Sequence, residues 1–110
     1  MHYKREEAFR YTFTQPVSGL AFHEESEEIT VQIIDVSPSG MKINSIHPIS
    51  ENTAINIKYK LIEEEFKVIG KIVWSLDYGD YIQCGISLKH SEEYHHRIIT
   101  VLKELAKVKG

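Results

Sequence analysis

The chain has 110 residues, of which 42% are hydrophobic and 26% are charged, as is typical of one folded domain. Its formal net charge of −3 argues against a general binder of nucleic acid or of membranes, because such proteins are normally basic. With Cys84 as the single cysteine there is no intrachain disulfide, and no apolar run is long enough for a secretory signal or a membrane span. The sequence therefore predicts a cytoplasmic domain that does not insert into membranes.

Residues 1–12 are expected to form a flexible arm that precedes the folded domain. Its basic residues Lys4, Arg5 and Arg10 alternate with aromatic side chains. Arginine presents paired donors that match phosphates and the guanine edge, and its plane stacks on bases. The arm is therefore a candidate for binding a nucleotide or another anion. A charged terminus that is merely solvated is the alternative for this segment alone.

Apolar and polar residues alternate through residues 13–90, which is typical of half-buried antiparallel strands. Strands are expected at Val17–His23, Ile29–Asp35, Met41–Ile46, Ile55–Leu61, Phe66–Trp74 and Ile82–Leu88. The short polar breaks at 24–28, 63–65 and 77–80 resemble hairpin loops. Because closure removes exposed sheet edges, six such strands predict a small antiparallel β-barrel over residues 13–90.

The same alternation assigns side chains to faces of the strands. In the fifth strand Trp74 falls on one face with Phe66 and Ile72, and in the sixth Cys84 falls on the apolar face. A thiol in that position is normally inert and packs as a small hydrophobic group. Cys84 is therefore interpreted as a core residue rather than as a nucleophile.

The segment Asp35–Gly40, Asp-Val-Ser-Pro-Ser-Gly, is the most informative part of the chain. By alternation Asp35 continues the face of Ile33, so its carboxylate must lie at the barrel rim or be paired, since burying it alone is costly. Asp35 and Ser37 project to the same side, and Gly40 allows positive φ or a close approach of backbone to a ligand. These are candidate ligand-binding residues, with a side-chain-capped turn as the alternative.

The period changes after His90, where a helix is expected over residues 91–108. Ser91 can cap it, and acidic residues follow in the first turn, where the helix dipole favours negative charge. One stripe then carries Tyr94, Ile98, Val101, Leu102, Leu105 and Val108. This stripe is expected to pack on the barrel, with a contact in a homodimer as the alternative.

No catalytic or metal-binding constellation is recognisable in the sequence. There is no Gly-x-Ser-x-Gly, no P-loop and no Gly-x-Gly-x-x-Gly. His90, His95 and His96 lack a second pair of ligands at matching spacing, so a metal site is not expected. The chain is therefore expected to bind rather than to catalyse, without catalytic residues, metal or cofactor.

An N-terminal arginine pair followed, some two dozen residues later, by Asp35-x-Ser37-x-x-Gly40 resembles the PilZ domain. Ile72–Trp74 and Cys84–Leu88 are similar to the last two strands of that family, so the resemblance covers nearly the whole chain. PilZ domains are bacterial receptors for cyclic di-GMP, built as a six-stranded barrel with a C-terminal helix. The resemblance implies this all-β fold and this ligand for the present chain.

The resemblance also implies roles for individual residues. Arg10 and Arg5 would bind phosphate or guanine. Asp35 would accept hydrogen bonds from guanine N–H groups, and Ser37 with the backbone around Gly40 would complete the site. The arm would become ordered on binding and signal to an effector protein of motility or polysaccharide export.

One feature departs from the family, whose first motif is Arg-x-x-x-Arg. Four positions before Arg10 the chain has Glu6, and Arg5 lies one position further away. Because a carboxylate at Glu6 repels phosphates, a PilZ-like adaptor that binds protein but no nucleotide is the alternative. A small barrel that binds single-stranded nucleic acid is a third hypothesis, which the acidic balance disfavours.

Overall fold

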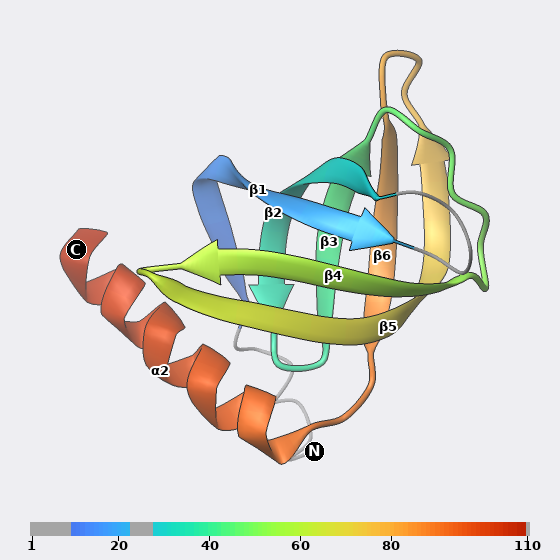
Figure 1. Cartoon of the computed structure of the whole chain (residues 1–110). Helices are drawn as coiled ribbons and strands as arrows, with labels where there is room; N and C mark the ends of the chain where they lie inside the picture. Colours follow the sequence, from blue (N-terminus) through green and yellow to red (C-terminus); the bar gives the residue numbers. More distant parts are fainter. Residues whose placement is uncertain (1–9, 23–27, 110) are drawn as a thin grey trace, which may run out of the picture.

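The computed structural model describes residues 10–22 and 28–109 of the chain. Its strands form a closed antiparallel barrel that is followed by one helix (Figure 1). The elements are β1 (Tyr11–Phe22), β2 (Ile29–Ser37), β3 (Gly40–Ser45), β4 (Ala54–Leu61), β5 (Glu64–Asp77), β6 (Ile82–Leu88) and α2 (Glu92–Lys109). The predicted six-stranded β-barrel with a C-terminal helix is confirmed.

The strands follow the order β1-β2-β3-β6-β5-β4, and β4 closes the barrel by pairing with β1. Hairpins join most neighbours in the sheet, whereas β3 pairs with β6 at a distance in the sequence. Closure gives each described strand a partner on both sides over part of its length. In the described ranges, no helix combines the length and the hydrophobicity that crossing a membrane requires.

Strand β1 is longer than expected, because it begins at Tyr11 rather than at Val17. Tyr11 and Thr12, which the sequence assigns to the arm, pair with the end of β2, and pairing resumes at Val17 after an irregular stretch. The rings of Tyr11 and Phe13 lie 5.3 Å apart and are packed against the core. Burial of these aromatic rings explains why the chain is already part of the barrel here. Residues 1–9 and His23 lie outside the described residues.

The core is formed by the inner faces of the strands. Its fully buried side chains include Val31, Ile33, Ile43, Ile55, Ile57, Phe66, Ile72 and Cys84. Cys84 is a core residue, as predicted, and burial raises the pKa of its thiol against the opposing effect of a hydrogen bond with Ser75. A thiol that stays protonated in the core has no nucleophilic role.

Helix α2 packs on the barrel through the predicted stripe. Tyr94, Ile98, Val101 and Leu102 are buried in the common core. The hydroxyl of Ser91 accepts a hydrogen bond from the Tyr94 N–H at 3.2 Å, which confirms the expected N-terminal cap. The Tyr94 and Tyr59 hydroxyls lie 2.5 Å apart. The side chain of Val108, the last residue of the stripe, lies outside the described part.

The β4–β5 connection is tighter than the expected loop at 63–65. Only Ile62 and Glu63 form the turn, both with positive φ, and Glu64 already belongs to β5. The Glu64 carboxylate accepts a hydrogen bond at 2.6 Å from Nε of Arg97, whose guanidinium lies 4.6 Å from the centre of the Phe66 ring. Glu64 therefore helps to hold α2 against the barrel.

Candidate functional site

An irregularity in β2 determines where the carboxylate of Asp35 lies. Ile33 pairs with Ile43 in β3, but Asp35 pairs with Lys42, so one residue of β2 is extra at this point. This β-bulge turns Asp35 to the outer face beside Lys42 and leaves the inner position to Val36, which is fully buried. The prediction that Asp35 continues the face of Ile33 is therefore wrong, because alternation holds only while the register is unbroken.

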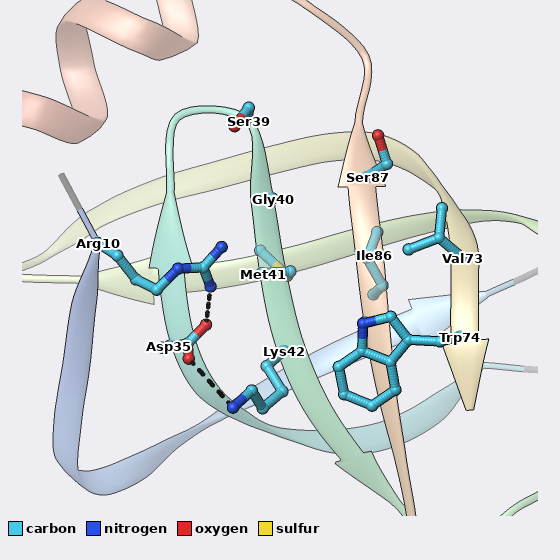
Figure 2. Close-up of a pocket in the computed structure, with 11 residues that line it drawn as sticks. Arg10, Asp35, Ser39, Gly40, Met41, Lys42, Val73, Trp74, Ile86 and Ser87 are labelled. Carbon is cyan, nitrogen blue, oxygen red and sulfur yellow. Dashed lines mark hydrogen bonds and ion pairs between the residues drawn. The ribbon is translucent and has the colours of Figure 1, made fainter. Parts of the chain in front are cut away.

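The Asp35 carboxylate is buried but paired, as the sequence required. Its Oδ1 lies 2.6 Å from Nη1 of Arg10, and its Oδ2 lies 3.7 Å from Nζ of Lys42 (Figure 2). The Asp35 side chain is 5% exposed, against 45% for Arg10 and 36% for Lys42. The buried carboxylate of Asp35 thus lies between two partly exposed cations, and both cations remain accessible to a ligand.

A second bulge, in β5, determines the position of Trp74. Ile72 pairs with Ile86, whereas Trp74 pairs with Gly85, so Val73 is the extra residue. The expectation that Trp74 shares the face of Ile72 is therefore wrong, since the indole lies on the outside of the sheet over Gly85. A Cβ at Gly85 would clash with Cε2 and Nε1 of the indole. Glycine is required here because any side chain would displace the ring.

The two bulges face each other across an open cavity of about 380 Å³ on the outer side of the barrel (Figure 2). This volume lies in the usual range of small-molecule sites. The cavity is lined by Arg10, Asp35, Ser39, Gly40, Met41, Lys42, Val73, Trp74, Gly85, Ile86 and Ser87. One wall offers two cations and a carboxylate, and the other offers a flat indole. Such walls suit a ligand that combines phosphates with an aromatic base.

The turn between β2 and β3 brings Gly40 to this cavity. The Ser37 hydroxyl is buried and accepts a hydrogen bond from the Gly40 N–H at 3.1 Å. A Cβ at Gly40 would lie 2.9 Å from the carbonyl oxygen of Ile86, so the glycine permits the close approach of β3 to β6. Ser37 is thus a turn cap that does not line the cavity, as the alternative from the sequence proposed, whereas Asp35 and Gly40 line it.

Of the five candidate residues, the structure brings Arg10, Asp35 and Gly40 together at one cavity, whereas Ser37 is not among its lining residues. Arg5 lies outside the described residues, as does Glu6. Lys42 and Trp74 also line the cavity, although neither was predicted as a site residue from the sequence. Gly85 could have indicated the position of Trp74, because a glycine inside a strand often marks a bulge or the close approach of another group.

No metal centre accompanies this cavity in the described ranges. There, no three histidine, cysteine, aspartate or glutamate side chains are grouped so that they could hold a metal ion. His90, His95 and His96 lie with Glu92 at the start of α2, around a separate surface depression. The chemistry that the cavity itself offers is ion pairing, hydrogen bonding and stacking.

Comparison with known proteins identifies the family. The PilZ domain model matches residues 4–104, so the chain belongs to the PilZ domain family. No curated protein matches the chain.

Several solved structures have the same fold. MrkH of K. pneumoniae in its apo state matches with a TM-score of 0.74 and 22% identity, over 93% of this chain and 53% of that chain. The PilZ domain of YcgR from Escherichia coli, solved with c-di-GMP, matches with a TM-score of 0.73 and 16% identity, over 92% and 93% of the two chains. The inhibitor of motility MotI of Bacillus subtilis matches with a TM-score of 0.67 and 11% identity, over 91% and 49%. The chain thus spans about half the length of MrkH and of MotI.

Proposed function

We propose that this chain is a non-catalytic cytoplasmic receptor domain that binds cyclic di-GMP in the cavity between the two bulges and signals to a partner protein. The observation that carries the proposal is the Arg10–Asp35–Lys42 charge cluster facing the Trp74 indole in one cavity. Membership of the PilZ family supports it, as do the c-di-GMP complexes of the YcgR PilZ domain and of MrkH.

The ligand combines two phosphates with two guanines, and each feature has a counterpart here. Arg10 would bind a phosphate or the guanine edge with paired donors. Asp35 would accept hydrogen bonds from guanine N–H groups. The indole of Trp74, on the opposite wall, would stack on a base, an interaction worth about 1–3 kcal/mol. Gly40 would let the nucleotide approach the backbone of β3.

Binding would require an exchange of partners within the charge cluster. In the structure Nη1 of Arg10 donates a hydrogen bond to Oδ1 of Asp35 at 2.6 Å. Phosphate would bind the guanidinium and guanine N–H groups would bind the carboxylate, so that each charged group keeps a hydrogen-bond partner. Arg5 would then join Arg10 on the ligand, and the resulting change of the arm would be the signal that a partner protein reads.

Calorimetric titration with cyclic di-GMP tests the proposal, with GTP as the control ligand. We expect saturable binding in the micromolar range or tighter and no comparable binding of GTP. Arg10→Ala should weaken binding by about 10–150-fold, because it removes a charge-assisted hydrogen bond of about 1.5–3 kcal/mol. Lys107→Ala, an exposed change on α2, is the matched loss of one positive charge and should bind like the wild type.

A second candidate function is a PilZ adaptor that binds a partner protein without the nucleotide. Glu6 favours it, because a carboxylate stands where the family has its first arginine and would repel phosphate. Absence of binding heat at ligand concentrations far above the micromolar range would select this function. Recovery of binding in Glu6→Arg would then identify Glu6 as the cause.

A further inference from the structure

A second surface of the barrel, on the outer side of β4 and β5, is strongly basic. It carries Lys58, Lys60, Lys67, Lys71 and Lys89, which we call the lysine face. Lys89 follows β6, and its N–H donates to the carbonyl oxygen of Ile69 at 2.8 Å, which fixes it beside β5. Five of the thirteen lysine and arginine residues of a chain with a net charge of −3 are thus gathered on one surface.

The charges on the lysine face are poorly balanced. Lys58 and Lys67 are directly opposite each other in the β4–β5 register, and like charges in that position destabilise a sheet. Glu65 compensates in part, since it lies 3.9 Å from Nζ of Lys58 and stands opposite Lys60 in the β4–β5 register. In the described part of the chain, no carboxylate lies within 4 Å of the other four lysines. The fold alone therefore gives no electrostatic reason for this cluster.

An apolar centre lies within the lysine face. Ile69 is 54% exposed, although it sits in the middle of a strand. Across β4 it is in line with Asn56 and with the partly buried Phe22 of β1, while Lys89 flanks it on the other side. An exposed apolar residue inside a ring of charge has the anatomy of a protein interface, with a dry centre and a polar rim.

We propose that the lysine face docks an acidic surface of a partner protein that presents an apolar side chain to Ile69. The five lysines and Ile69 lie on the outer face of the sheet, so we expect the partner to contact this surface through side chains. The net charge of −3 opposes the approach of a uniformly anionic membrane or of a nucleic acid. A small acidic patch on a partner protein would contact only the lysine face, so the negative charges elsewhere on the chain would repel it less. All five basic residues are lysines, which present point charges, whereas arginine would present the paired donors that suit phosphate.

This inference rests on the adaptor role in the proposed function and adds the chemistry of the partner. The lysine face borders the ligand cavity, because Lys71 pairs in register with Ser87, which lines the cavity. A partner seated on the lysine face would therefore lie next to a bound nucleotide.

Fluorescence anisotropy with a labelled glutamate-rich peptide that contains a central leucine tests the inference on the full chain. We expect saturable binding that weakens at least about tenfold when KCl rises from about 50 mM to about 500 mM. Lys67→Glu/Lys89→Glu should weaken binding at least about tenfold. Lys103→Glu/Lys107→Glu, an equal change of net charge on exposed positions of α2, should change it by less than about twofold. Ile69→Ser should weaken binding about fivefold, through loss of apolar contact.

Three results would overturn the inference: no binding by the wild type, equal loss in both charge variants, or binding of phosphatidylserine vesicles or an oligonucleotide in preference to the peptide. Misfolding is excluded by thermal melting, because Lys67→Glu replaces a like-charge pair with an attractive one and should not lower the midpoint. Titration of the same proteins with cyclic di-GMP is a separate readout. Peptide binding without nucleotide binding would reject only the receptor proposal, and the reverse result would reject only the docking inference.

Discussion

Replacing Asp35 by asparagine separates the charge of the central carboxylate from its shape. Asparagine keeps the size of the side chain and one acceptor oxygen but removes the negative charge. Arg10 Nη1, now 2.6 Å from Oδ1, and Lys42 Nζ, 3.7 Å from Oδ2, would then face each other without an anion between them. Both the stability and the ligand affinity of the domain should respond, by amounts that the structure allows us to compare.

The loss of stability should be moderate. Removing one partner of a fully buried ion pair costs about 3–5 kcal/mol, because the other charge is left dry. Here the side chains of Arg10 and Lys42 are 45% and 36% exposed, so water continues to solvate both cations. We expect the free energy of unfolding of Asp35→Asn to fall by about 1–2 kcal/mol, and the thermal midpoint to fall by several degrees.

The loss of affinity should be larger. A hydrogen bond from guanine to a charged acceptor is worth about 1.5–3 kcal/mol, so cyclic di-GMP should bind Asp35→Asn about 10–150-fold more weakly. Calorimetric titration measures this, with circular dichroism melts to show that the variant is folded. Asp80→Asn, at an exposed position of the β5–β6 hairpin, is the matched control.

Affinity of the folded Asp35→Asn variant within about twofold of the wild type would refute the acceptor role of Asp35. A rise in affinity would refute it as well, because it would mean that Asp35 only competes with phosphate for Arg10.

Three further changes test the packing around the site and the helix. Gly85→Ala should displace the indole of Trp74, the only tryptophan, and so shift its fluorescence emission and weaken nucleotide binding; unchanged emission would contradict the packing. Burial raises the pKa of Tyr94 to about 12 from 10.0. The contribution of the protonated Tyr94 hydroxyl to the free energy of unfolding is therefore fully present below pH 10 and should be lost as the pH rises through 12, by about 3 kcal/mol at most. Urea unfolding across this range should show a shallower decline for Tyr94→Phe. Ser91→Ala should lower the free energy of unfolding by about 1 kcal/mol through loss of the cap, and an unchanged urea midpoint would argue against the cap.

The inner faces of the strands could be predicted from the sequence because alternation is a local property. Where the register is regular, most of the alternating apolar side chains are buried, as for Ile43, Ile57 and Ile86. The helix could be predicted for the same reason, since Ser91 and the apolar stripe lie within one continuous segment. The period of two residues in a strand and of 3.6 residues in a helix can be recognised without knowing which strand lies next to the segment.

The candidate site depends on information that alternation does not contain. A bulge is a mismatch between two strands, so it becomes visible only when the partner and the register are known. The extra residue before Asp35 and the extra residue before Trp74 reverse the faces of both side chains. A carboxylate and an indole are side chains that can bind a ligand, and this is visible in the sequence. That Asp35 and Trp74 line the same cavity follows from the pairing of β3 with β6, which are distant in the sequence.

The same bulges also explain how the barrel accommodates these two residues. Without the bulge in β2, Asp35 would take the inner position that Val36 occupies, where an unpaired carboxylate would cost several kcal/mol. Without the bulge in β5, Trp74 would point into a core already filled by Phe66 and Ile72, which are fully buried, and overpacking is destabilising too. Each bulge thus removes an incompatible side chain from the core and supplies one wall of the cavity. The stability of the barrel and the composition of the site therefore have a common origin in the register of β2 and β5.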